Sequence, residues 1–526
     1  MIKDNAIVVG MNDKGEYVSL LPDKVNRHGL VAGATGTGKT VTLKVLAESF
    51  SDMGVPVFMA DVKGDVAGLE APGTDSEDMQ ERLHRFKLED TFQYKGYPVV
   101  LWDIYGQAGI PLRTTVSEMG PLLLARILDL NSVQTDLLTV AFKIADDHDL
   151  LLIDTKDLKA LLNYISENRK DFAQDYGNIT EASLLTIVRA IVALEMVGAD
   201  RFFGEPALSI QDWFQPDPSG RGLIHILDSS VLIKNGKLYS TFLLWMLSEL
   251  FEVLPEVGDL DKPRMVFFFD EAHLLFHDAS KVLLDKIEQV VKLIRSKGIG
   301  IYFCTQNPRD IPDGVLAQLN NKIQHGLRAY SPTEQKAVRA AADSFRPNPA
   351  FDTLEAILSV GTGEAVLSFL QADGTPQEAQ KVAILPPQSR FGALDQATRE
   401  AVIKSSFYYL KYASPVDNPS AYEFLQRKGE EDRERAALQA EEEKKQMEKA
   451  KQEAALQKEQ EREERQYRAA RNRATKQVGN TVAGTVGREV GKTMGAVFGG
   501  RFGKTLGGNV GASLARGLFG TFTWKK

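Results

Sequence analysis

The chain of 526 residues has 43% hydrophobic and 25% charged side chains, which excludes a wholly disordered protein and allows more than one segment. Its net charge is −8, yet residues 468–526 hold eleven Lys or Arg and one acid, so that residues 1–467 carry −18. An acidic body argues against a broad DNA-coating surface, because non-specific duplex binding depends mostly on neutralised phosphates. It does not argue against a narrow basic channel inside a ring. The apolar runs are too short or interrupted to span a bilayer and no signal-peptide pattern is present, so we expect a cytoplasmic protein.

Strand and helix patterns alternate along most of the chain. An apolar run at 29–32 predicts a buried strand, and a glycine-rich loop, a helix to about residue 50 and a second apolar run at 55–60 follow it. This unit predicts a parallel sheet covered by helices. Leucine, isoleucine and alanine recur at helical spacing over 121–212, which predicts a helical insertion. Further strands are predicted at 99–102, 223–227, 265–269, 299–304 and 365–370.

Residues 427–468 are nearly all Glu, Lys, Arg, Gln and Ala. A coiled coil needs apolar positions sustained every three and four residues, whereas the large aliphatic side chains here are Leu438, Met447 and Leu456. We therefore expect a solvated single helix that Glu–Lys pairs stabilise and that acts as a semi-rigid spacer.

Glycine recurs at every fourth position of the basic C-terminal segment, from Gly487 to Gly511. On a helix these residues would form a small-residue stripe that lets backbones approach closely, in membranes or in tight oligomers. Each glycine also costs a helix about 1 kcal/mol relative to alanine, which favours a flexible tail, and both interpretations stay open. The interleaved apolar and basic residues add the hypothesis that this tail contacts a membrane surface, peripherally at the inner membrane.

The sequence GATGTGKT at 33–40 matches a phosphate-binding loop, with a predicted strand before it and a helix after it. Glycines permit a backbone conformation in which amides point at phosphates, assisted by the helix N-terminus. Lys39 would neutralise the β- and γ-phosphate oxygens, and Thr40 would offer a ligand to Mg²⁺. A turn that merely starts a helix does not require this spacing. We therefore predict that Thr40 contributes to a Mg²⁺ site and that ATP is bound by Gly33, Ala34, Thr35, Gly36, Thr37, Gly38, Lys39, Thr40 and Val41.

The apolar strand at 265–269 ends in Asp270 and Glu271, which places two carboxylates at the edge of a parallel sheet where ligands bind. We predict that Asp270 holds the magnesium shell and that Glu271 orients and polarises the attacking water. Alone, an apolar run followed by two acids is a weak motif, often a simple strand end. Its occurrence together with a phosphate loop supports the magnesium and water roles. Gln306 follows the strand at 299–304 and is suited to contact the γ-phosphate, although a strand-end turn residue fits the pattern equally well.

Other polar residues receive weaker assignments. The segment from Asp61 to Asp65 ends a strand at the same edge, where a supporting role and a salt-bridged turn are both compatible with the pattern. His273 is expected to be a structural histidine rather than a base, and the single cysteine, Cys304, a small core residue. The seven histidines are scattered, so we predict no zinc site or other metal cluster.

These motifs resemble those of the HerA and FtsK superfamily of ring ATPases, and more closely its bacterial HerA-like C-terminal-domain group. The resemblance covers most of residues 1–387 and implies a RecA-like hexamer with nucleotide at its subunit interfaces. In such motors, arginines ahead of the phosphate loop and after the acidic strand couple neighbouring subunits. By position these look like Arg27 and Arg295, although a plain surface role fits both. The motifs are NRHGLVAGATGTGKT at 26–40, ADVKGD at 60–65, LWDIYGQAGIPLRTTVSEMGPLLLARIL at 101–128, FFFDEAHLLF at 267–276, CTQNPRDIP at 304–312 and QHGLRAYSPTEQKAVRAAA at 324–342.

We therefore predict an α/β protein with a RecA-like P-loop fold, a mainly parallel sheet, a helical insertion and a C-terminal helical and low-complexity tail. The predicted function is Mg²⁺-dependent ATP hydrolysis by a homohexamer that acts as a DNA translocase or helicase-like motor, where DNA is implied by the resemblance alone. The alternative is a nucleotide-switched oligomeric or membrane-associated scaffold that does not act on nucleic acid. The predicted parts are an ATPase core at 1–120 and 213–390, the helical insertion at 121–212, a connecting helical segment at 391–426, the charged spacer at 427–468 and the basic glycine-repeat tail at 469–526.

Overall fold

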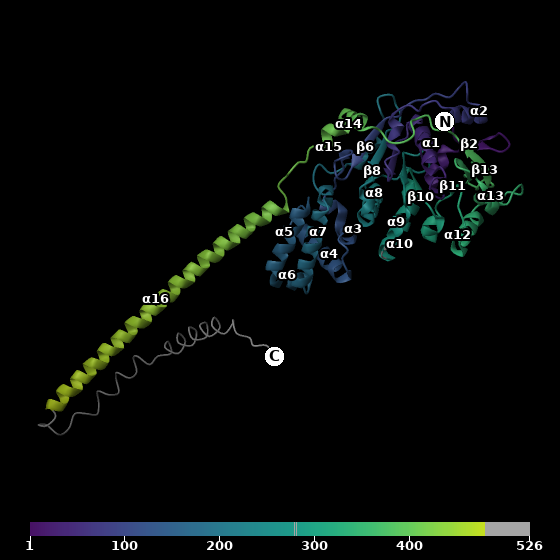
Figure 1. Ribbon diagram of the computed structural model, residues 1–526. Helices are drawn as coiled ribbons and strands as arrows, with labels where there is room; N and C mark the ends of the chain where they lie inside the picture. The colour runs from purple at the N-terminus through teal and green to yellow at the C-terminus, as the bar shows by residue number, and fades with distance from the viewer. Residues whose placement is uncertain (278, 280, 479–526) are drawn as a thin grey trace. The chain divides into compact units, whose positions relative to one another are not determined.

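The computed structural model describes residues 1–277, 279 and 281–478 (Figure 1). Residues 1–430 form one compact unit, and the described residues 431–478 belong to a second. A mixed sheet of thirteen strands runs through the first unit. Its strands are β1 (Ile2–Lys3), β2 (Ala6–Asn12), β3 (Tyr17–Leu20), β4 (Gly29–Ala32), β5 (Val57–Asp61), β6 (Val99–Asp103), β7 (Ile110–Pro111), β8 (Ile224–Asp228), β9 (Met265–Phe269), β10 (Ile299–Thr305), β11 (Asn321–His325), β12 (Glu364–Ser368) and β13 (Gln380–Ile384).

The sheet is parallel over most of its width and antiparallel at one end. Its strand order is β1-β2-β13-β12-β11-β4-β10-β9-β5-β8-β6-β7, with β3 paired to β2. Neighbours from β11 to β7 run parallel, whereas β12 and β13 are antiparallel to their neighbours. One strand, β10, separates β4, which precedes the phosphate loop, from β9, which precedes the two acids. This additional strand is the RecA-like arrangement, so the predicted α/β fold with a mainly parallel sheet is confirmed.

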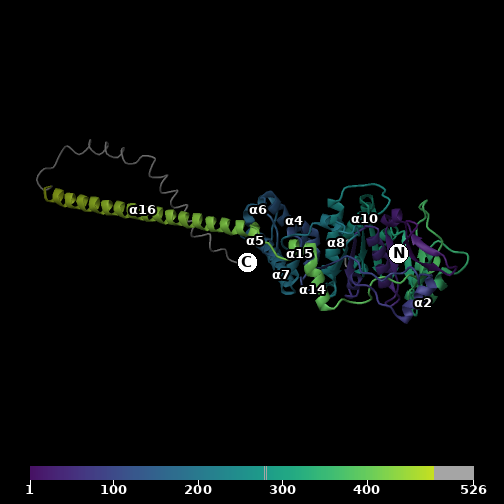
Figure 2. The same cartoon turned by 90° about the horizontal axis from the view of Figure 1, so that it is seen from above.

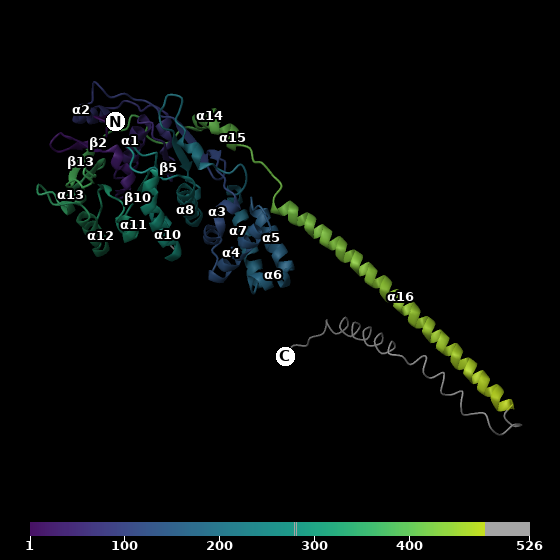
Figure 3. The same cartoon turned by 180° about the vertical axis from the view of Figure 1, so that it is seen from behind.

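Helices cover both faces of the sheet. On one face, α1 (Lys39–Asp52) and α2 (Glu77–Phe86) share a core with β2 and β13. The core on the other face holds the helices between β7 and β8, which Figure 3 shows grouped together, and the two long helices that follow them. These are α3 (Val116–Ile127), α4 (Ser132–Asp147), α5 (Thr155–Glu167), α6 (Arg169–Tyr176), α7 (Glu181–Met196), α8 (Gly236–Val253) and α10 (Lys281–Leu293). The short α9 (His273–Phe276) and α11 (Asp313–Leu316) flank β10, while α12 (Pro332–Asp343) and α13 (Thr353–Ser359) pack on β12 in a small third core.

The helices between β7 and β8 begin at residues that cap helix N-termini. Thr115 and Glu118 form a capping box at α3, and Asn131 and Gln134 form another at α4. Such reciprocal bonds satisfy amides that have no partner inside the helix. The positions of α3 to α7 overlap the stretch at 121–212, and the division of the chain into the parts named above stays a prediction.

The predicted strands all occur within one or two residues of their expected ends. The strands β1, β2, β3, β7, β11 and β13 were not predicted. In β11 the reason is its polar sequence NKIQH, in which Asn321, Gln324 and His325 are all buried. Backbone carbonyls accept hydrogen bonds from each of these side chains, for example His28 O from Asn321 Nδ2 at 3.1 Å. Burial of polar groups is tolerated where such partners exist.

The chain after β13 is anchored at the β8–β6 end of the sheet. Figure 2 shows α14 (Gln396–Ser405) and α15 (Phe407–Tyr412) next to each other. The rings of Tyr408 and Tyr412 each lie 5.6 Å from the ring of Trp102 in β6. Arg399 donates a hydrogen bond of 2.6 Å to Asp228, at the end of β8. Aromatic packing and a partly buried ion pair therefore hold this segment.

Residues 431–478 are the larger part of α16 (Ala421–Val478). Leu438, Met447 and Leu456 are all at least half exposed. Ion pairs join acids to bases four residues later, as in Glu441–Lys445 at 2.8 Å, and this order suits the helix dipole. The described helix thus resembles the solvated single helix expected from the composition.

The predicted glycine stripe and membrane contact concern residues 479–526 and lie outside the described residues. No helix that the structure describes is both long enough and apolar enough to cross a bilayer.

His225 of β8 is buried between aromatic rings. Trp102 Nε1 donates to its Nδ1 at 3.2 Å, its Nε2 donates to Trp213 O at 3.2 Å, and its ring stacks on Trp213 with centroids 5.0 Å apart. Burial lowers the pKa of His225 to about 3, because the charged form would lose its hydration. The histidine is therefore neutral in the folded protein at physiological pH.

Acid should destabilise the protein through this histidine. Below pH about 6.5 the unfolded chain binds a proton that the folded chain does not bind until about pH 3, so stability is lost as the pH falls through that window. The loss approaches about 1.4 kcal/mol per pH unit. Urea unfolding at pH 7 and pH 5 should therefore show a smaller pH effect in His225→Phe than in the wild type. Equal pH effects in both proteins would contradict this assignment.

Candidate nucleotide site

The phosphate loop joins β4 to α1 and is anchored on both sides. Gly33 N donates to Thr305 O at 3.2 Å, and Ala34 N donates to Gly326 O at 3.0 Å. The two strands that flank β4 therefore hold the first residues of the loop. Its last residue, Gly38, has a φ of 110° and caps α1, a conformation that strains any residue with a side chain.

The loop presents backbone amides to an anion. Within the described residues, no hydrogen bond uses the amide of Gly36, Thr37 or Gly38 as its donor. These amides precede the N-terminus of α1, where the helix dipole favours negative charge. Lys39 lies beside them and donates from Nζ to Gly33 O at 2.5 Å. Three amides, a helix N-terminus and a cation together fit a phosphate group.

The two acids lie next to this loop. Burial lowers the pKa of Lys39, and the negative charges of Asp270 and Glu271 oppose that shift, which places both carboxylates near the lysine. Tyr239 of α8 donates from its hydroxyl to Asp270 O at 2.6 Å, and Glu271 N donates to Asp270 Oδ1 at 2.9 Å. The structure thus brings together the loop and the acidic residues singled out in the sequence.

Gln306 connects Glu271 to the phosphate loop. Gln306 Nε2 donates to Glu271 Oε1 at 3.1 Å, and Thr35 Oγ1 donates to Gln306 Oε1 at 3.4 Å. On its other side, Glu271 Oε2 lies 3.3 Å from His273 Nδ1. Glu271 also has a φ of 47°, which is uncommon for a residue with a side chain. The strained backbone and the hydrogen bond from Gln306 hold this carboxylate, whereas His273 Nδ1 approaches it without a hydrogen bond.

The acids and the loop have the chemistry of a magnesium triphosphate site. Burial raises the pKa of Asp270 to about 6, and the neighbouring Glu271 adds to the shift. A cation against Asp270 would favour its ionised form. Mg²⁺ prefers oxygen ligands, and Thr40 offers a hydroxyl in the first turn of α1. Among the described residues, no group of three or more His, Cys, Asp or Glu is placed to hold a metal ion by itself.

Aspartate also ends three other parallel strands, where it serves the local structure. Asp61 accepts hydrogen bonds from the amides of Gly64 and Val66, so its turn is held by carboxylate–amide bonds rather than by the salt bridge considered above. Asp103 closes the turn after β6 in the same way, and Asp228 pairs with an arginine of α14. Only the partners of each aspartate, and not the strand-end pattern, separate these roles.

Arg27 and Arg295 lie at the opposite edge of the sheet. They precede β4 and β10, whereas the phosphate loop follows β4. Both are near the buried His28, because burial lowers the pKa of that histidine to about 4 and the charges of Arg295 and Arg27 lower it further. The structure therefore does not bring these arginines to the phosphate loop of their own chain.

Two residues at the site had no functional assignment from the sequence: His273 contacts Glu271, and His325 is buried beneath the loop. Lys63 belongs to the segment 61–65, for which a supporting role was one alternative, and it is near enough to Asp270 for its charge to lower the pKa of that carboxyl. The signal for His325 was its place at the end of a strand that neighbours β4, much like the place of Gln306 directly after β10. It was hidden because the strand itself, β11, looks polar.

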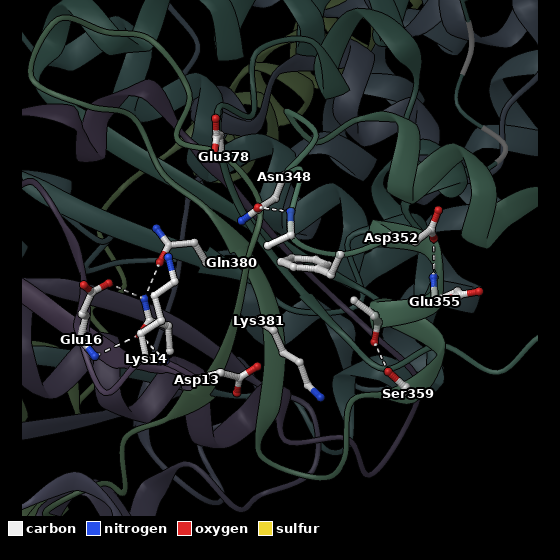
Figure 4. A pocket seen from close by; sticks show the side chains of 14 residues that line it. Asp13, Lys14, Glu16, Asn348, Asp352, Glu355, Ser359, Glu378, Gln380 and Lys381 are labelled. Atoms are coloured by element: carbon white, nitrogen blue, oxygen red, sulfur yellow. Dashed lines mark hydrogen bonds between the residues drawn. The ribbon is translucent and has the colours of Figure 1, made fainter.

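Cavity volume alone does not identify the site. A cavity of about 310 Å³ adjoins the loop and includes Ala34, Thr35, Gln306 and Arg328 in its lining. A larger cavity of about 650 Å³ lies between the β2–β3 turn, β13 and α13 (Figure 4). Acids outnumber bases in the lining of the larger cavity, which disfavours a triphosphate. The charged residues there are Asp13, Glu16, Asp352, Glu355, Glu378, Lys14 and Lys381.

Short stretches of the chain are similar to archaeal helicases. A probable helicase of Methanocaldococcus jannaschii, MJECL08, is 34% identical over 116 residues, which are 21% of this chain and 20% of that protein. The DNA double-strand break repair helicase HerA of Sulfurisphaera tokodaii is 30% identical over 99 residues, 19% of each chain. The chain thus spans about a fifth of the length of the curated relatives that it matches.

Similar solved structures include a bacterial conjugative coupling protein and a VirB4 protein. The conjugative coupling protein TrwB has a TM-score of 0.49 and 16% identity, covering 75% of this chain and 92% of TrwB. VirB4 of Thermoanaerobacter pseudethanolicus has a TM-score of 0.48 and 15% identity, covering 73% of this chain and 97% of VirB4.

One family model matches nearly the whole chain. The model, described as "Helicase HerA-like C-terminal", covers residues 7–523. Its span includes the phosphate loop, the acidic strand end and Gln306. The chain therefore belongs to the Helicase HerA-like C-terminal family of P-loop ATPases.

Proposed function

We propose that this protein hydrolyses ATP with Mg²⁺ and uses the energy as a homohexameric ring that moves along or remodels double-stranded DNA. The observation that carries the proposal is the meeting of the phosphate loop with Asp270 and Glu271, joined through Gln306. Family membership supports the ATPase part of this proposal.

Binding depends on the loop. The free amides of Gly36 to Gly38 would contact phosphate oxygens, and the Lys39 ammonium would leave its carbonyl partners for the β- and γ-phosphates. Thr40 and Asp270 would hold Mg²⁺, which supplies positive charge to the phosphate oxygens. Because Asp270 is buried and disfavours its own charge, Mg²⁺ and the triphosphate should bind together.

Hydrolysis depends on the carboxylate of Glu271. In the proposed mechanism it accepts a proton from a water molecule and orients that water toward the γ-phosphate. Gln306 Nε2 donates a hydrogen bond to Glu271 Oε1, and Gln306 Oε1 accepts one from Thr35 of the loop. In the proposed mechanism, this connection makes the position of Glu271 depend on whether the γ-phosphate is bound. His273 supports the same carboxylate as a positioning residue.

The ring is proposed from the arginines and from the family. β4 has four residues and spans about 13 Å, so Arg27 at its start cannot reach the loop at its end in the same chain. Arg295 is exposed at the same far edge. An arginine there is suited to a neighbouring subunit, where it would meet transition-state charge in trans.

The scaffold alternative has one observation in its favour. Residues 1–467 carry −18, an adverse charge for contact with DNA phosphates. A DNA motor then needs its basic residues gathered in the channel of the ring, whereas a scaffold needs no such channel.

Replacing Lys39 by alanine should reduce ATP affinity roughly 100-fold, because hydrogen bonds to charged groups contribute about 1.5–3 kcal/mol. Calorimetric titration with ATP and Mg²⁺ checks this. Lys297→Ala is the control, since the Lys297 ammonium is buried and, like that of Lys39, donates to a backbone carbonyl, here Leu254 O, far from the loop. Wild-type affinity in Lys39→Ala would rule out the assigned role.

Glu271→Gln should retain ATP binding but lower the hydrolysis rate roughly 10²- to 10⁴-fold, because an amide is no base and its oxygen still accepts from Gln306. Phosphate release and ATP titration on the same sample separate the two effects. Glu249→Gln, a change at a half-buried carboxylate of α8, should hydrolyse ATP at the wild-type rate. Unimpaired turnover in Glu271→Gln would refute the water-activating role.

Duplex DNA should accelerate hydrolysis, and ATP should shift the mass from 58.1 kDa toward six times that value. The acceleration should weaken as salt rises, because phosphate contacts release counterions. Hydrolysis assays with duplex, with single-stranded DNA and with anionic vesicles, combined with mass photometry, test both parts. A rate that responds to vesicles or to self-assembly but to neither DNA would favour the scaffold.

A further inference from the structure

His325 lies beneath the phosphate loop and touches both of its ends. It is the last residue of β11 and its side chain is fully buried. A Cβ added to Gly33, the first loop residue, would come within 2.5 Å of His325 Cβ. A Cβ added to Gly38, the last one, would lie 3.7 Å from His325 Cε1. His325 therefore lies against Gly33 through its Cβ, whereas at Gly38 the backbone of Gly363 is nearer, at 3.1 Å, and the imidazole is within van der Waals distance.

Both ring nitrogens of His325 have partners that fix their roles. Nδ1 lies 2.9 Å from Glu364 O, and a carbonyl only accepts, so Nδ1 carries the proton. Nε2 lies 2.9 Å from Thr42 Oγ1 and, in a neutral ring, accepts from this hydroxyl. Burial lowers the pKa of His325 to about 4, in agreement with a neutral ring. Thr42 is three residues after Lys39, on the same side of α1.

The carbonyl that His325 holds belongs to a second support of the loop. Gly363 N, in the turn at 361–364, donates to Thr37 O at 3.0 Å. Arg82 of α2 covers this glycine from outside, since a Cβ there would lie 2.9 Å from Arg82 Nη2. Glu364 is also paired with an arginine of α2 at 3.0 Å. His325 thus joins the loop, the start of α1 and this turn.

We propose that His325 is a positioning residue for nucleotide binding, which holds Thr42 and the turn at 361–364 so that the loop amides and Lys39 face the phosphates. It acts through the loop and does not touch ATP. The inference rests on the proposed ATPase function. A histidine that merely fills the core would tolerate phenylalanine, which keeps the ring and removes both polar atoms, without any change in nucleotide affinity.

The test compares His325→Phe with His225→Phe in the full chain. His225 is also buried, makes two hydrogen bonds and lies in β8, away from the loop. Both changes should lower the melting temperature. Only His325→Phe should raise the KM for ATP, by roughly tenfold or more, since small misplacements of binding groups cost this much. The kcat per folded molecule should change far less, because Glu271 and Gln306 keep their contacts.

A purely structural role would reduce the folded fraction and leave KM unchanged, so KM separates the two roles. His325→Asn provides a second variant, since its amide can still donate to Glu364 O; its KM should lie between those of the wild type and His325→Phe. A wild-type KM in both folded His325 variants overturns the inference while leaving the ATPase proposal intact. If the wild type neither binds nor hydrolyses ATP, the proposed function is wrong, and the inference on His325, which rests on it, is wrong as well.

Discussion

The nucleotide end of the sheet depends on β4 being held between two parallel neighbours. This strand has only four residues, and it pairs with β10 on one side and β11 on the other. The same two neighbours continue past its end and accept the first two amides of the phosphate loop, at Thr305 and Gly326. A shift of the loop would therefore break the ladder on both sides. Close approach enforces the register at the other end, where a Cβ on Gly29 would meet the ring of Tyr302 at 2.2 Å.

This constraint also determines which side chains can act together. The carboxyl ends of parallel strands meet at one edge, so Glu271, Gln306 and His325, at the ends of β9, β10 and β11, lie near the loop that follows β4. The additional strand places an amide between the carboxylate and the loop, and the contacts from Thr35 through Gln306 to Glu271 are the result. The same rule assigns Arg27 and Arg295 to the far edge. The proposed hydrolysis and the proposed coupling between subunits would thus occupy opposite edges of one sheet.

The glycine loop could be predicted from the spacing of its glycines and lysine. The apolar strands could be predicted from the sequence because burial on both faces leaves a continuous apolar run. That principle fails for β11, whose Asn321, Gln324 and His325 are buried with hydrogen bonds that no local pattern shows. The phosphate loop and Asp270 with Glu271 could be singled out by spacing. The strand-end aspartates Asp61, Asp103 and Asp228 carry the same local signal. Only the hydrogen-bond partners in the structure, nearby amides for the first two and an arginine for the third, reveal their roles. The contact of Gln306 with Glu271 likewise joins residues 35 positions apart.

Cys304 lies in β10, at the centre of this arrangement. Its side chain is fully buried, and its carbonyl accepts a hydrogen bond from Ala272 N, just after the two acids. Burial also raises the pKa of the Cys304 thiol, so that little of the reactive thiolate forms. Because the sequence contains one cysteine, the rate at which a thiol reagent labels the intact protein reports the exposure of this one side chain. Thiol labelling therefore measures how often the centre of the sheet, next to the phosphate loop, becomes accessible to solvent.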